Sequence, residues 1–203
     1  MLLRGRQTGT LYGVLGINAV MFVVISAAAL YSMSSALLSD ALDNLGDALT
    51  YGLSLYAVSR SGEVKARIAI FKGGLIFLAA CGVGAQIIYK LFVPVVPVFE
   101  IMGTFAVLAL VANSLCLLLL FRHRNDDINM SSVWECSRND VVSNVSVIVA
   151  AGAVWLTSSG WPDLAVALCL LAFLMRSALG VIRSGLQELH AETASDHEPR
   201  GKV

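Results

Sequence analysis

The sequence predicts an all-α membrane protein with six transmembrane helices. Hydrophobic residues make up 57% of its 203 residues and charged residues only 14%, about half the charged share of soluble globular proteins. The mean hydropathy is +0.77, and a soluble domain of this length could not hide so much apolar surface. Six apolar stretches are long enough to cross about 30 Å of hydrocarbon as helices of about 20 residues.

The six predicted spans follow one another with short breaks. They are 11–33, 40–59, 70–92, 98–121, 131–157 and 162–185. The first is too long for the core of a signal peptide. The break between the first two, SMSSALLS, is short and barely polar, whereas the later breaks RSGEVKAR, VPVVP, RHRNDDINMS and SSGWPD carry the Pro, Gly and charged residues that end helices.

Lys and Arg residues predict how the spans are oriented. The first, third and fifth connections hold only Lys90, whereas most of the other basic residues lie near the termini and the even-numbered connections. By the positive-inside rule, both termini are cytoplasmic. We expect an integral protein of a bacterial inner membrane, with a cytoplasmic N-terminus over 1–10, one transmembrane domain over 11–187 and a short, disordered cytoplasmic tail over 188–203.

The second span is unusual because it contains three aspartates, in SDALDNLGDALTYGLSLYAVS. An ionised Asp at the centre of a membrane helix costs about 2.5–3.5 kcal/mol, so such residues face the interior of the bundle. Asp43 and Asp47 share one helical face because they are four residues apart. Two carboxylates this close repel one another unless a proton or a cation lies between them, which suggests a site for a divalent metal.

A second polar cluster opens the fifth span, in SSVWECSRNDVVSNVSVIVAAG. Cys136 and Asp140 are four residues apart, and Asn144 continues the same stripe. A thiol and a carboxylate facing Asp43 and Asp47 would form a four-ligand tetrahedral site of the kind that zinc accepts. The thiolate favours zinc or cadmium over magnesium or calcium. Whether Asn144 joins this site stays open.

Several of these polar residues also have a structural interpretation. Cys136, taken alone, fits a small buried apolar role. Asp40 fits helix capping near the outer surface better than metal binding. Glu135, Arg138 and Asn139 could pair with one another or line the cytoplasmic entrance. Arg138 is also the best structural partner for the aspartates of the second span, and metal contact by Glu135 or Asp40 stays open.

These motifs resemble those of the cation diffusion facilitators, a family marked by paired [HD]xxxD motifs in the second and fifth of six spans. SDALDNLGD places Asp43 and Asp47 at the motif positions. CSRND places Asp140 at the second position, and Cys136 stands where the family usually has histidine. The Trp-Pro-Asp turn before the last span is also similar, and the likeness covers most of 10–190.

The resemblance implies a six-helix bundle with a metal site at mid-membrane. It also implies export of a divalent transition metal such as Zn²⁺ or Cd²⁺ from the cytoplasm, in exchange for protons, by alternating access in a homodimer. The family's cytoplasmic metal-binding domain does not follow the sixth span in this sequence, so we expect any dimer to form through the membrane helices. Cys136 in place of histidine leaves the metal undetermined.

Other function classes fit less well. The net charge is zero, which gives no basic field for nucleic acid. No P-loop or dinucleotide motif supports ATP-driven transport or an enzyme. Two alternatives stay open: a membrane metal-binding or regulatory subunit that does not transport, and a carrier whose acids only relay protons.

Overall fold

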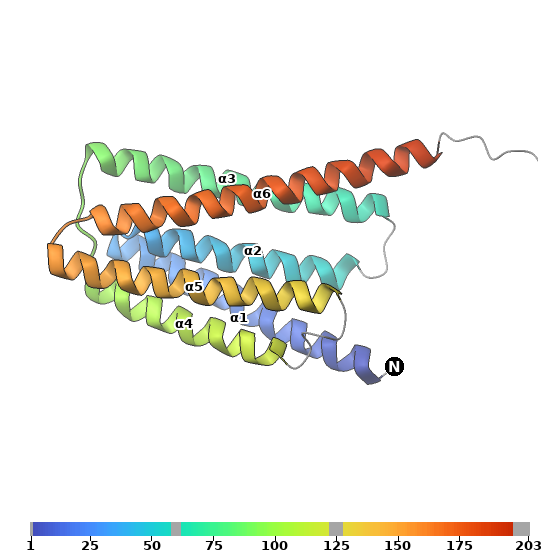
Figure 1. The fold of residues 1–203 in the computed structure, drawn as a ribbon, viewed down its shortest axis with the longest axis horizontal. Coiled ribbons are helices and arrows are strands. Elements are labelled where there is room, and N and C mark those ends of the chain that lie inside the picture. The colour runs from blue at the N-terminus through green and yellow to red at the C-terminus, as the bar shows by residue number, and fades with distance from the viewer. Residues whose placement is uncertain (1, 58–61, 122–127, 197–203) are drawn as a thin grey trace, which may run out of the picture.

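The structure is a computed structural model that describes residues 2–57, 62–121 and 128–196. These residues form six α-helices, with short connections between them (Figure 1). The helices are α1 (Leu2–Ser32), α2 (Ser35–Ala57), α3 (Gly62–Phe92), α4 (Phe99–Phe121), α5 (Ile128–Thr157) and α6 (Trp161–Asp196). Side-chain surroundings are described for most of 8–190, with gaps that include 128–133, 135 and 136.

The predicted fold class is confirmed, with one informative exception among the helices. Five helices are long and apolar enough to cross a membrane, and α2 is the helix that falls short. The reason is its three aspartates, because α2 is still 23 residues long. The helices extend beyond several predicted ends, and α6 continues to Asp196, into the predicted tail. The division into domains stays a prediction.

The helices alternate in direction and form two groups. α1, α2, α4 and α5 form a bundle, in which α1 packs on α2 and α4 packs on α5, while α3 and α6 form a crossed pair. Both α3 and α6 contact α2, and α6 also contacts α5 (Figure 1). We call the end of the bundle where α1 begins and α6 finishes the terminal end, and the opposite end the far end.

The α3–α6 pair owes its close contact to two glycines. A Cβ atom on Gly73 would lie 2.6 Å from Cγ1 of Ile182, and one on Gly185 would lie 2.8 Å from Cγ1 of Ile70. Both distances are shorter than real contacts allow. The close contact is specific to these positions, because a Cβ on the neighbouring Gly74 would meet nothing within 4 Å.

The start of α2 is held at the far end by Asp163, from the first turn of α6. The Asp163 carboxylate accepts hydrogen bonds from the backbone amides of Ser35 (2.9 Å) and Ala36 (3.0 Å) and from the hydroxyl of Ser34 (2.6 Å). A helix start leaves amides without partners and carries a partial positive charge, so an anion is stabilising there. The α5–α6 corner thereby fixes the position of α2.

Lys90, in the last turn of α3, completes this far-end cluster. Its ammonium lies 3.9 Å from the Asp163 carboxylate and donates hydrogen bonds to the Ser35 hydroxyl (2.8 Å) and to the carbonyl of Met33. Met33, the residue after α1, has a φ of 56°, a left-handed conformation that costs a non-glycine residue roughly 1–2 kcal/mol. The bond from Lys90 supports that turn.

The capping role expected for Asp40 is wrong. α2 begins five residues earlier than predicted, at Ser35, and the Ser34 hydroxyl accepts a hydrogen bond from the Leu37 amide as an N-cap does. Asp40 therefore lies within the helix and is fully buried. The helix start was misplaced because SMSSALLS carries little polar signal apart from its serines.

Candidate metal centre

The structure brings together one predicted ligand from each motif, Asp47 of α2 and Asp140 of α5. Both side chains are buried inside the bundle, and their carboxyl groups lie within hydrogen-bonding reach of one another. Two ionised carboxylates could not form a hydrogen bond at such a contact, because ionised carboxylates only accept. The pair is thus a place where a proton or a metal cation can offset the repulsion of two acids.

Asp43 lies one turn from Asp47 toward the far end. Its side chain is only partly buried, and its carboxyl group lies within electrostatic range of both Asp47 and Asp140. Asp43 therefore adds negative charge to the centre. The side chain of Cys136 lies outside the described residues, so its expected ligation stays a prediction.

The described side chains alone do not complete a metal site. Among them, no three His, Cys, Asp or Glu residues form a group that could hold a metal ion. The Asp47–Asp140 pair supplies two oxygen-bearing groups of the predicted four. The four-ligand set of Asp43, Asp47, Cys136 and Asp140 therefore stays a prediction, because one of its members, Cys136, has a side chain outside the described residues.

Around the acid pair lie three residues that are not members of the predicted ligand set. The Tyr51 hydroxyl donates a hydrogen bond to Oδ2 of Asp47 at 2.9 Å. Tyr51 packs in a small buried cluster with Cys116 of α4, whose thiol is within electrostatic range of both acids. The Asn18 amide of α1 donates to that thiol at 3.8 Å. Tyr51 could have been found from its four-residue spacing to Asp47.

Arg138 does not neutralise the aspartates of α2. Its side chain is exposed, and its guanidinium lies over the Trp134 ring, 5.5 Å from the ring centre. The buried ion pair of the described residues joins Lys90 to Asp163, and the exposed pair of Arg67 and Glu63 lies within α3. The structural alternative considered for Asp43 and Asp47 therefore has no support in the described part of the chain.

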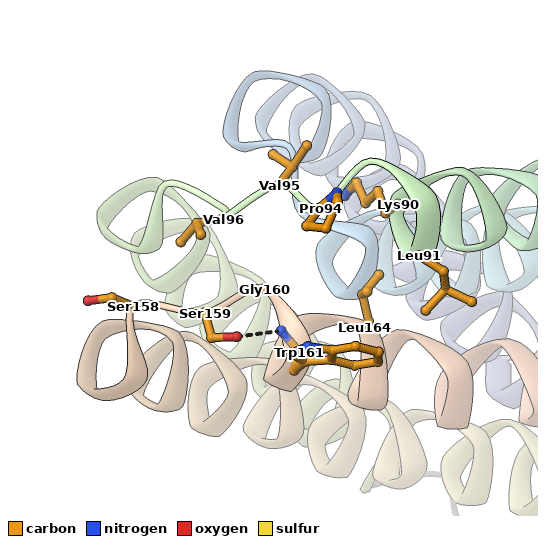
Figure 2. A pocket seen from close by; sticks show the side chains of 10 residues that line it. All are labelled: Lys90, Leu91, Pro94, Val95, Val96, Ser158, Ser159, Gly160, Trp161 and Leu164. Carbon is orange, nitrogen blue, oxygen red and sulfur yellow. Dashed lines mark hydrogen bonds between the residues drawn. The ribbon is translucent and has the colours of Figure 1, made fainter.

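A pocket of about 150 Å³ lies at the far end, away from these acids. It is enclosed by Pro94, Val95 and Val96 of the α3–α4 connection and by the α5–α6 corner, with Lys90 and Leu164 beside it (Figure 2). In this corner the backbones approach so closely that a Cβ on residue 160 would lie 2.2 Å from the Val95 carbonyl. The pocket thus lies where the α3–α4 connection packs against the α5–α6 corner, and it is separate from the acidic centre.

Comparison with known proteins agrees with this arrangement. A family model described as the cation efflux transmembrane domain matches residues 11–190, which include both aspartates of the pair. Among curated proteins, the chain is similar to the cation efflux system protein CzcD of Alcaligenes sp. (strain CT14), with 26% identity over 174 residues. That alignment covers 76% of the chain and 55% of the relative, so the chain spans about half the length of the curated protein that it matches.

Proposed function

The chain belongs to the cation efflux family, and on that premise we propose that it exports a divalent metal cation across the membrane in exchange for protons. The observation that carries the proposal is the close pair of Asp47 and Asp140, two acids buried where α2 meets α5. Buried acids inside a membrane protein mark ion and proton pathways. A relative named as a cation efflux protein supports the same direction of transport.

The proposed cargo is Zn²⁺ or Cd²⁺, bound by Asp43, Asp47, Cys136 and Asp140. The two carboxylates already adjoin, and Asp43 lies within electrostatic range of both. We propose that Asp43 and Cys136 complete the set when the cation is bound. A thiolate among the ligands favours these softer ions over magnesium or calcium.

The proposed cycle exchanges protons for metal at the acid pair. A metal ligand must be deprotonated to bind, so metal capture would release any proton bound by Asp47 or Asp140. Movement of α2 and α5 relative to the α3–α6 pair then changes the side from which the pair is reached. Protons arriving there displace the metal. By the distribution of Lys and Arg, the terminal end is proposed to be cytoplasmic, and two copies of the chain are proposed to associate through membrane helices.

Flux into proteoliposomes that contain a metal-sensitive dye tests this proposal. Asp140→Asn should lower Zn²⁺ and Cd²⁺ flux at least about a hundredfold, because the pair loses a metal ligand. Glu100→Gln, which neutralises an exposed acid at the far end, should leave the flux unchanged. Equal flux in the Asp140→Asn and Glu100→Gln variants would refute the proposal. Metal binding without flux in the unaltered chain would identify a binding subunit, and proton flux without metal binding would identify a proton carrier.

Cys136 of the proposed set and Cys116 of α4 offer a matched test of metal preference. Cys136→Ser should lower the ratio of Cd²⁺ flux to Zn²⁺ flux, because a hydroxyl is a harder ligand than a thiolate. Cys116→Ser should leave the ratio unchanged, since the proposed set does not include that thiol. A shift in the second variant alone would assign the soft ligand to α4 in place of α5.

A further inference from the structure

Beside the acid pair, toward the far end, lie buried polar atoms that have no hydrogen-bond partner. They are Oδ2 of Asp40, Oδ1 of Asn44, and both Oδ1 and Nδ2 of Asn144. The side chains are 1%, 2% and 0% exposed. A buried polar group without a partner costs about 1–3 kcal/mol, so their presence together in one part of the bundle calls for an explanation.

The direction of the two helices places these atoms on one side of the acid pair. α2 runs from the far end to the terminal end, and α5 runs the opposite way beside it (Figure 1). Asn44 precedes Asp47 by one turn and Asn144 follows Asp140 by one turn, so both asparagines lie one step closer to the far end. Because Asp47 and Asp140 contact one another, Asn44 and Asn144 lie at the same level on facing helices.

The hydrogen bonds of α2 show which atoms are free to bind. The Asn44 amide nitrogen donates to the backbone carbonyl of Asp40 at 3.0 Å, which leaves Oδ1 of Asn44 as its unpaired end. Oδ2 of Asp40 lies one further turn along the same face, and its carboxyl group is still within electrostatic range of Asp140. The free atoms are therefore mostly acceptors, and a carboxylate is among them.

We infer that Asp40, Asn44 and Asn144 form a second cation position, in series with the Asp47–Asp140 pair and on its far-end side. A partly hydrated divalent cation would satisfy the oxygens directly, and one of its waters would accept from Nδ2 of Asn144. This inference rests on the proposed function, since the cation is the transported one. A position built only of oxygen donors holds a soft ion more weakly than one with a thiolate, which suits release.

Binding of Mn²⁺ to the purified full chain, followed by electron paramagnetic resonance, tests the second position. Mn²⁺ is the probe because it prefers oxygen ligands. The Asp47→Asn/Asp140→Asn chain should still bind one Mn²⁺, and adding Asn144→Leu should abolish that binding. The matched control adds Ser39→Ala instead, which alters a buried hydroxyl that already donates to the Ser35 carbonyl, and should retain the bound ion.

Two outcomes would refute the second cation position and leave the proposed function unaffected. One is an Asp47→Asn/Asp140→Asn chain that binds no Mn²⁺ while the unaltered chain transports metal. The other is equal binding with and without Asn144→Leu. Failure of the unaltered chain to bind or transport any metal would refute both proposals.

A second measurement covers the case in which the variant without the acid pair does not fold. In the otherwise unaltered chain, Asn144→Leu should reduce the bound Mn²⁺ from two per chain to one, and lower the maximal metal flux about tenfold. Without metal, the midpoint of thermal unfolding should stay equal or rise, because an apolar side chain replaces an unpaired amide. Two bound ions in this variant would contradict the inference, as would a large fall in the midpoint without metal.

Discussion

The bundle contains two buried polar clusters that differ in how completely they are paired. At the far end, the Asp163 carboxylate accepts three hydrogen bonds from residues 34–36 and faces the Lys90 ammonium. In the middle of the bundle, the carboxyl groups of Asp47 and Asp140 lie close together, while Asp40, Asn44 and Asn144 keep polar atoms without partners. The far-end cluster pairs opposite charges and gives its carboxylate three hydrogen-bond donors. The central cluster contains more acids and acceptors than donors.

This difference separates a structural role from an exchange role. A fully paired buried charge stabilises one arrangement, because removing any partner leaves an unpaired charge in a medium of low polarity. An incompletely paired acceptor cluster is costly until a proton, a water or a cation enters it. Mutations in the far-end cluster should therefore affect stability, and mutations in the central cluster should affect binding and flux.

The largest stability effect is expected for Asp163→Ala. It leaves Lys90 buried without its counter-charge and removes the cap from α2, so the free energy of unfolding should fall by about 3–5 kcal/mol. Thermal unfolding in detergent micelles measures the loss as a lower midpoint. A double variant, Asp163→Leu with Lys90→Met, should recover part of it. A midpoint unchanged in Asp163→Ala would remove the structural role of this cluster.

Lys90→Met should cost less, about 1.5–3 kcal/mol. The smaller loss is expected because Asp163 keeps the two backbone amides and the Ser34 hydroxyl as donors. The same unfolding measurement checks the order of the two variants. A larger loss in Lys90→Met than in Asp163→Ala would show that support of the Met33 turn outweighs the cap on α2.

Tyr51→Phe should act on the central cluster alone. It removes the hydroxyl that donates to Asp47 at 2.9 Å, a bond worth about 0.5–1.5 kcal/mol, so affinity for Zn²⁺ should change roughly three- to tenfold. Titration calorimetry on the purified chain measures the change, and Tyr12→Phe at an exposed position is the control. Equal affinities in the two variants would show that the hydroxyl does not orient Asp47.

The smallest stability effect is expected for Asp140→Leu in the absence of metal. Because two buried acids repel one another unless a proton or a cation lies between them, and Asp47 keeps the Tyr51 hydroxyl as a donor, the free energy of unfolding should change by less than about 1 kcal/mol or increase. The variant should also lose the rise in the unfolding midpoint that a bound cation gives the unaltered chain. A fall in the free energy of unfolding as large as that expected for Asp163→Ala would contradict the assignment of a structural role to the far-end cluster and an exchange role to the central cluster.

The fold could be predicted from the sequence because apolar runs of membrane length are a strong signal that needs no tertiary contact. The meeting of Asp47 and Asp140 could also be anticipated, since buried acids on two helices must face the interior. The cap on α2 could not be predicted, because Asp163 is far away in the sequence from Ser35 and Ala36. The wrong capping prediction for Asp40 follows from this, because a helix start that is capped by a residue of another helix leaves little signal in its own sequence.

The contribution of α1 and α4 to the centre was also beyond sequence reasoning. Cys116 and Asn18 each lie in an apolar stretch with no neighbouring polar residue four positions away to suggest a site. Only the packing of α4 on α5 and of α1 on α4 brings them toward the acid pair. The unpaired state of Asn44 and Asn144 is likewise a property of the assembled bundle.

The close approach of α3 and α6 at Gly73 and Gly185 constrains the mechanics of the whole molecule. Sliding one of these helices along the other would drive Ile70 or Ile182 into the opposite backbone, so the pair resists shear and moves as one body. A change in bilayer thickness or lateral tension would then be relieved at the contacts of α2 and α5 with this body. Lipid composition would thus tune the rate of the proposed transport cycle more than the folding of the chain.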